Sequence, residues 1–161
     1  SFWKKFKKIN QYSIGIEIHN PGHNYGYEYF NKKQIKSIKH LSLMLAKKYN
    51  IKKKHFLGHS DIAPSRKKDP GEKFPWEYLA KRNIGYWHNI KKNTLIKLRY
   101  KKCSKIFKKQ FFNNLFKIGY SRVYKSQNEK LLIKAFQRRF RPKLVNGIID
   151  HECLKISKNL I

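Results

Sequence analysis

Isoleucines alternate with small or charged residues near the start of the chain. The alternating positions are Ile14, Ile16 and Ile18. A period of two is the spacing of one face of a β-strand, so the pattern predicts a strand over residues 13–18 with its isoleucines against a core. Gly15 and Glu17 would share the opposite face. A charged residue in a strand usually faces solvent, and the pattern alone gives Glu17 no other role.

A second apolar pattern has helical spacing and predicts a helix over residues 34–49. Its apolar stripe is Ile35, Ile38, Leu41, Leu45 and Tyr49. Further on, residues 55–58 form a short apolar run that predicts a strand. Pro75 suits the first turn of a helix, which we expect over residues 76–81.

The last third of the chain has helical spacing throughout and predicts three helices. The first ends near Gly119, the second is ended by Pro142, and Asp150 is a candidate N-cap for the third. Their apolar positions are Ile106, Phe107, Phe111, Leu115 and Ile118, then Leu131, Leu132, Ala135, Phe136 and Phe140, then Leu154 and Ile156.

We predict two domains joined by a linker. Residues 1–87 form the first domain, residues 88–98 a linker or irregular connection, and residues 99–161 the helical domain. Cys103 and Cys153 are the only cysteines and form no Cys-x-x-Cys motif. We therefore expect two buried thiols, with a disulfide possible but unsupported.

The chain is strongly basic, with 39 Lys and Arg against 9 Asp and Glu and a net charge of +30. This balance favours an anionic partner: nucleic acid, anionic lipid or an acidic polymer. Evenly spread lysines also fit a compositional bias of the coding sequence, so both interpretations stay open. No stretch approaches the ~20 apolar residues of a membrane span. Four acids gather in one segment, which indicates a local need for negative charge: Asp61, Asp69, Glu72 and Glu77.

The candidate chemistry lies in residues 58–71, where His59 and Asp69 are ten positions apart and Lys67 precedes the aspartate by two. Imidazole and carboxylate are both zinc ligands, and a catalytic zinc site needs three protein ligands and an open position. Spacing alone is weak evidence, because such a pair in a loop is usually solvated. His19 and His23 are loop histidines that we leave out of the metal set.

Several motifs in order resemble the zinc-dependent N-acetylmuramoyl-L-alanine amidases, the superfamily that includes the peptidoglycan recognition proteins. They are SFW at 1–3, YSIGIE at 12–17, GHSDIAPSRKKDPG at 58–71 with FPW at 74–76, AFQ at 135–137 and NG at 146–147. The chain is most similar to the bacterial cell-envelope branch with a C-terminal peptidoglycan-binding domain. The resemblance implies an α/β fold, with a mixed central sheet flanked by helices and a small three-helix domain after it.

The resemblance also implies roles for four residues. Zn²⁺ would be held by His59 and Asp69. Glu17 would be the catalytic base, and Lys67 would stabilise the oxyanion. Lys68 stands where relatives often have an acidic residue, which would weaken the metal site or shift its pH dependence. The family's further zinc histidine lies upstream of the SFW motif, so we expect the N-terminal part of the catalytic domain to be missing.

Three functions compete on the sequence. The leading one is zinc-dependent cleavage of the bond between N-acetylmuramic acid and L-alanine in peptidoglycan or muropeptides. The second is a non-catalytic, wall-binding remnant of an amidase. The third is a charge-driven binder of nucleic acid or anionic membrane surfaces; no DNA-reading motif supports specific nucleic-acid binding. By resemblance we expect the cell envelope, either the periplasm or the outer membrane, as the location.

Overall fold

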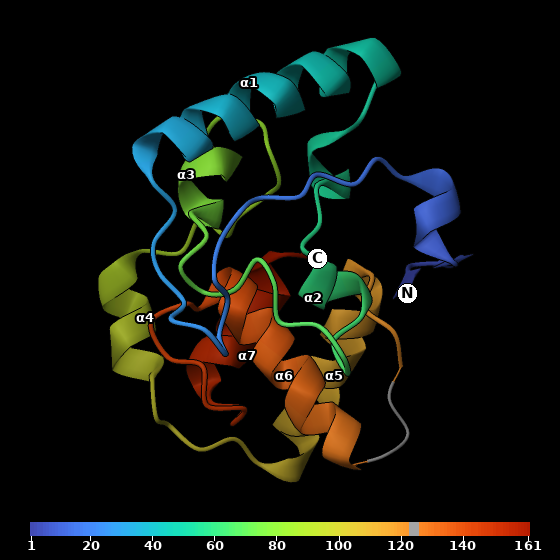
Figure 1. Cartoon of the computed structure of the whole chain (residues 1–161). Helices are drawn as coiled ribbons and strands as arrows, with labels where there is room; N and C mark the ends of the chain where they lie inside the picture. Colours follow the sequence, from blue (N-terminus) through green and yellow to red (C-terminus); the bar gives the residue numbers. More distant parts are fainter. Residues whose placement is uncertain (123–125) are drawn as a thin grey trace.

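The computed structural model describes residues 1–122 and 126–161 and is built mostly of helices (Figure 1). The helices are α1 (Lys32–Tyr49), α2 (His59–Ile62), α3 (Trp76–Ala80), α4 (Lys92–Leu98), α5 (Lys105–Ile118), α6 (Ser126–Phe140) and α7 (His151–Asn159). Two 3-10 turns, η1 (Ile9–Tyr12) and η2 (Lys53–His55), and two strands, β1 (Phe2–Trp3) and β2 (Phe6–Lys7), complete the elements.

The predicted mixed central sheet is not found in the described part of the chain, whose strands are the antiparallel pair β1 and β2. Residues 13–18 and 55–58 were predicted as strands, and both predictions are wrong. Strand pairing needs a neighbour for the backbone N–H and C=O groups. Within the described residues, the backbone of 14–18 pairs with no other backbone segment. Accordingly, Ile14 is 49% exposed instead of facing a core.

The long helix α1 confirms the predicted helix at 34–49. Its start is a capping box: the Asn31 side chain accepts the Gln34 backbone N–H at 2.9 Å, and the Gln34 side chain accepts the Asn31 N–H at 3.0 Å. The helix ends at Asn50, which has a left-handed φ of 51° and donates its N–H to Ala46. Ile38 is buried against α3, the helix predicted at 76–81, which is also confirmed.

Two apolar clusters hold the fold together. One lies between α1 and α3 and contains Ile38, Phe74, Trp76, Leu79 and Ile84. The larger one joins the N-terminal segment to α4, α5, α6 and α7, and includes Trp3, Leu95, Phe111, Phe136 and Ile156. Trp87 packs against both clusters and links them. The cluster around α1 and α3 and the cluster around the C-terminal helices are therefore in contact through Trp87.

The three predicted C-terminal helices are confirmed as α5, α6 and α7. The Asp150 side chain accepts the Cys153 N–H at 2.9 Å, as expected of an N-cap. Residues 92–98, inside the segment predicted as a linker or irregular connection, form helix α4 with Leu95 buried. The domain boundaries themselves stay a prediction.

The expected buried thiols are confirmed, since both cysteines are free and buried. Burial raises the pKa of the Cys153 thiol to about 12, and the thiolate is the reactive form. We therefore expect that a disulfide reagent at pH 8 modifies neither thiol of the folded chain in the time needed for full reaction in urea. Absorbance of the released chromophore measures this, and rapid reaction of Cys153 in the folded chain would contradict it.

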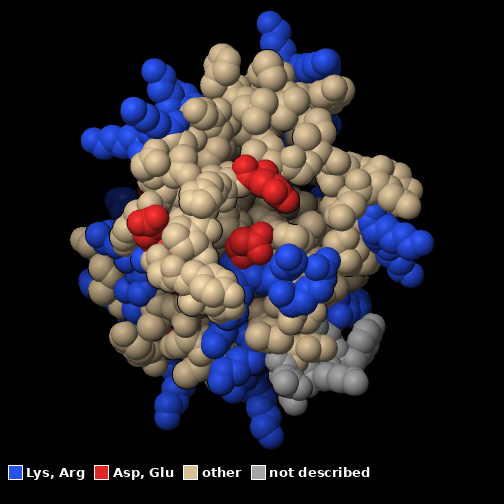
Figure 2. Space-filling model, in the orientation of Figure 1, with Lys and Arg blue, Asp and Glu red and all other residues tan. Residues whose placement is uncertain are grey.

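The few charges in the interior are paired, while most of the basic residues lie on the surface. Three carboxylates are buried against arginines: Asp61 contacts Arg139, Asp150 contacts Arg141, and Glu152 contacts Arg99 and Arg141. Figure 2 shows lysines and arginines around the rim of one face, with separate acidic patches nearer its middle. Among the described helices, none combines the length and apolarity that a membrane crossing requires.

Candidate active site

The candidate site is built on the turn that follows Leu57. Gly58 leads directly into the four-residue helix α2, whose first residue is His59. A Cβ at Gly58 would lie 2.9 Å from the Pro70 ring. The two backbone segments can approach this closely only because residue 58 is glycine. The segment that carries His59 is thereby pressed against the segment that carries Asp69.

The structure brings the two predicted zinc ligands together. Nδ1 of His59 lies 3.0 Å from Oδ2 of Asp69, and the side chains are 36% and 60% exposed. A backbone bond supports the contact, because the Ser60 N–H donates to the Asp69 carbonyl at 2.9 Å. An exposed ion pair contributes little to stability, so this pair is better suited to binding than to holding the fold.

Lys67 lies in the same loop and is half-buried. Its backbone N–H donates to the Ala63 carbonyl at 3.0 Å, which turns the chain back toward Asp69. Glu17 is exposed in the irregular segment before α1. Among the described contacts, neither side chain reaches His59 or Asp69. The catalytic roles of Glu17 and Lys67 therefore stay predictions.

The donors present match zinc in kind, since nitrogen and carboxylate oxygen are its usual ligands. They are two donors, one fewer than the three protein ligands of a catalytic zinc site. In the described part of the chain, no group of three or more His, Cys, Asp or Glu side chains could hold a metal ion. If His59 and Asp69 bind a metal as predicted, they would supply two of its ligands, and a third donor would be needed to complete the set.

Known amidases resemble this chain in sequence. Residues 3–72 match the family model described as N-acetylmuramoyl-L-alanine amidase. Over its whole length the chain is 32% identical to the N-acetylmuramoyl-L-alanine amidase AmiD of Escherichia coli K12. The chain is homologous to these amidases. The resemblance to these amidases that the sequence motifs indicated is confirmed.

The homology covers the whole of this chain but only part of its relatives. The chain spans 61% of the length of AmiD. It is also 38% identical over 76 residues to the 1,6-anhydro-N-acetylmuramyl-L-alanine amidase AmpD of Haemophilus influenzae, covering 46% of this chain and 39% of AmpD. We therefore assign the activity of the full-length relatives to this chain only as a proposal.

Solved amidase structures share its fold. E. coli AmiD in complex with anhydro-N-acetylmuramic acid-L-Ala-D-γ-Glu-L-Lys superposes with a TM-score of 0.87 at 32% identity, over 99% of this chain and 65% of AmiD. AmpDh3 of Pseudomonas aeruginosa in complex with an anhydromuramic pentapeptide gives a TM-score of 0.80 at 27% identity, over 98% of this chain and 65% of AmpDh3. Both relatives were therefore captured with muropeptides bound.

The loop that contains His23 and Tyr27 supports the Asp69 segment of this amidase homologue. The Tyr27 hydroxyl donates to the Pro70 carbonyl at 2.8 Å and accepts the Lys73 N–H at 2.8 Å. His23 stacks on Tyr27 and lies 3.0 Å from the Glu72 carboxylate. Burial raises the pKa of Tyr27 to about 12. Only the fold could reveal the contacts with Pro70, Glu72 and Lys73, because they join residues more than 40 positions apart.

Replacing Tyr27 by phenylalanine tests this support. It leaves the Pro70 carbonyl and the Lys73 N–H without their partner, so we expect the free energy of unfolding to fall by about 1–3 kcal/mol. Urea unfolding followed by circular dichroism measures the change. Tyr25→Phe is the matched control, because Tyr25 is 81% exposed. Equal stability of the two variants would contradict a supporting role for Tyr27.

The acids near the site have structural partners, which revises the idea of a local need for negative charge. Glu72 contacts His23, and Glu77 contacts Lys81 at 2.8 Å. Asp61 is buried and accepts three donors: the Gly58 N–H, the Tyr120 hydroxyl and the Arg139 guanidinium. Asp69 is thus the acid of this group with the most freedom to bind a ligand.

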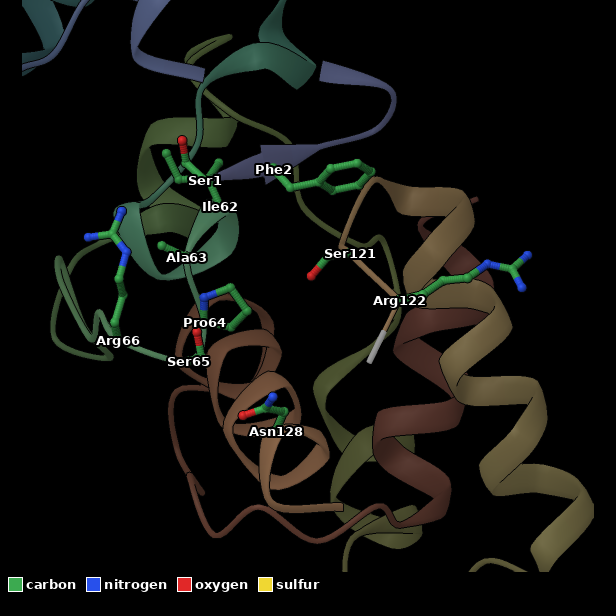
Figure 3. Close-up of a pocket in the computed structure, with 10 residues that line it drawn as sticks. All are labelled: Ser1, Phe2, Ile62, Ala63, Pro64, Ser65, Arg66, Ser121, Arg122 and Asn128. Atoms are coloured by element: carbon green, nitrogen blue, oxygen red, sulfur yellow. The ribbon is translucent and has the colours of Figure 1, made fainter. Parts of the chain in front are cut away.

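A cavity of about 400 Å³ is lined in part by residues 62–66 of the same loop (Figure 3). Residues 62–66 form one wall, and Phe2, Ser121 and Asn128 contribute to the others. The guanidinium of Arg122 points away from the other lining residues and lies over Phe116. None of the four predicted site residues lines this cavity. It is therefore a neighbour of the His59–Asp69 pair and not the same site.

Proposed function

We propose that this chain is the core of a zinc-dependent amidase that hydrolyses the bond between N-acetylmuramic acid and L-alanine in peptidoglycan. The observation that carries the proposal is the contact between His59 and Asp69 in a chain homologous to N-acetylmuramoyl-L-alanine amidases. Muropeptides bound to AmiD and AmpDh3 support the substrate class. The proposed setting is the cell envelope, where such substrates occur.

In the proposed mechanism, His59 and Asp69 hold the metal together with a third donor. These residues would hold zinc, which when bound would supply Lewis-acid chemistry at the scissile carbonyl and lower the pKa of water. The Glu17 carboxylate takes the proton of the attacking water and passes it to the nitrogen of the leaving L-alanine. The Lys67 ammonium stabilises the negative charge that develops on the carbonyl oxygen as the water oxygen bonds to the carbonyl carbon, and the carbonyl re-forms when the C–N bond breaks and the amine leaves.

The basic surface suits this substrate. Stem peptides and wall polymers carry carboxylates, and a net charge of +30 attracts them over distances of about 10 Å at moderate ionic strength. The same attraction would act on an anionic membrane surface. This electrostatic attraction requires no specific site for nucleic acid.

A digestion tests the proposal. The 161-residue chain is incubated with Zn²⁺ and purified muropeptides, and mass spectrometry follows the release of peptides that begin with L-alanine. We expect release that is lost in His59→Ala and in Asp69→Ala. His40→Ala is the matched control, because His40 is exposed on α1. Binding of muropeptides without any release would contradict catalysis by this chain.

A further inference from the structure

The buried carboxylate of Asp61 lies directly behind the proposed metal ligand. Asp61 follows His59 by two residues in the same short helix, α2, and is 1% exposed. Its Oδ2 accepts the Gly58 N–H at 2.7 Å, and its Oδ1 accepts the Tyr120 hydroxyl at 2.6 Å. This carboxylate therefore fixes the backbone that immediately precedes His59.

Arg139 contacts both ends of the segment 56–61. One of its guanidinium nitrogens donates to Asp61, and the other donates to the Phe56 carbonyl at 2.8 Å. The guanidinium also lies 4.1 Å from the centre of the Trp76 ring. The Asp61–Arg139 pair is buried at both partners. Such a pair has little freedom to shift, because separating the charges inside the protein is costly.

The two side-chain partners of Asp61 come from the C-terminal part of the chain. Tyr120 follows the end of α5, and Arg139 lies in the last turn of α6. Tyr120 is fully buried, and this burial, together with the Asp61 charge, raises the pKa of its hydroxyl well above the usual value. The hydroxyl thus keeps its proton near neutral pH and can donate to Asp61. The helices predicted to bind the wall polymer reach the back of the candidate active site.

We propose that Tyr120 and Arg139 are positioning residues for His59, acting through Asp61. The inference rests on the proposed function, in which His59 is a metal ligand. The C-terminal part of the chain then has a role besides any contact with the wall polymer. It fixes the orientation of the His59 side chain relative to Asp69. Neither residue touches the metal or the substrate.

Tyr120→Phe is the sharpest test, because it removes one hydrogen bond to Asp61 and leaves the Arg139 pair in place. Tyr86→Phe is the matched control: Tyr86 lies in the same cluster, 5.5 Å from the Arg139 guanidinium, and has no hydrogen bond to Asp61. Ile156→Val, in the buried face of α7, supplies a loss of stability at a distance from the site.

Three measurements on the full chain report the effect. We expect hydrogen exchange of the Gly58 amide to accelerate about tenfold in Tyr120→Phe. We expect the affinity for Zn²⁺ alone, measured by calorimetry, to fall about tenfold, as for other partners that support a metal ligand. We also expect the response of the His59 Nδ1 resonance to Asp69→Asn to shrink. Tyr86→Phe and Ile156→Val should leave all three at wild-type values after correction for global stability.

The outcomes separate the inference from the proposed function. If wild-type protein binds no Zn²⁺, the proposed function fails, and the Gly58 exchange and the Nδ1 response still decide the positioning role. If Tyr120→Phe behaves like Tyr86→Phe in these two measurements, the inference is overturned. Altered exchange with an unchanged Nδ1 response also overturns it, since Tyr120 would then stabilise the fold without positioning His59.

Discussion

Arg139→Met should lower the free energy of unfolding by about 3–5 kcal/mol, because it breaks a buried ion pair. Methionine fills much of the space of the arginine stem but carries no charge. The Asp61 carboxylate would then be buried without its ionic partner, and the Phe56 carbonyl would lose a donor. Most of the loss comes from the uncompensated buried charge and not from lost packing.

Urea unfolding followed by circular dichroism measures this loss, and a double variant identifies its cause. Adding Asp61→Asn to Arg139→Met removes the stranded charge, so part of the lost stability should return. Arg82→Met is the surface control, because Arg82 is exposed and its change should fall within about 0.5 kcal/mol. Strict additivity of the two buried substitutions would refute the assigned cause.

Glu17→Gln should have the largest effect on catalysis, a fall in stem-peptide release of about 10²- to 10⁴-fold. Glutamine keeps the size and a hydrogen-bonding oxygen but cannot take a proton from water. Because Glu17 is exposed and makes no described side-chain contact, the substitution should leave the unfolding free energy unchanged. Activity and stability would thus respond separately.

The digestion of muropeptides with Zn²⁺ provides the measurement, with released peptide quantified per unit time. Glu28→Gln is the matched control, since Glu28 is another exposed glutamate in the neighbouring loop. Full activity of Glu17→Gln, alongside an inactive His59→Ala, would mean that another group accepts the proton. Equal losses in Glu17→Gln and Glu28→Gln would point to an effect of charge and not of a catalytic base.

Local sequence patterns predicted the helices well. The stripe in α1, the proline before α3 and the N-cap at Asp150 each depend on residues a few positions apart. Helix hydrogen bonds are formed inside one segment, so a local pattern suffices. The strand predicted at 13–18 failed for the opposite reason. A strand needs a partner from elsewhere, and the described residues provide none for it.

The candidate site was predictable in part. The spacing of His59 and Asp69 lies within one loop, so the sequence motif identified a pair that the fold does bring to 3.0 Å. The same motif contains Asp61, which the sequence analysis counted only as one of a group of acids. Its actual task depends on Arg139, 78 positions away. No pattern within the loop could assign that partner.

By itself, then, the sequence determined helices α1, α3, α5, α6 and α7, the excess of basic residues, the buried thiols, the resemblance to amidases and the His59–Asp69 pair. These features depend on composition, on short periodic patterns or on a contiguous motif. The tertiary structure alone decided which acids are buried, that Tyr27 supports the Asp69 segment, and that the C-terminal helices lie behind His59. Each of these depends on contacts between segments distant in the chain, where burial makes a charge or a hydrogen bond costly to lose.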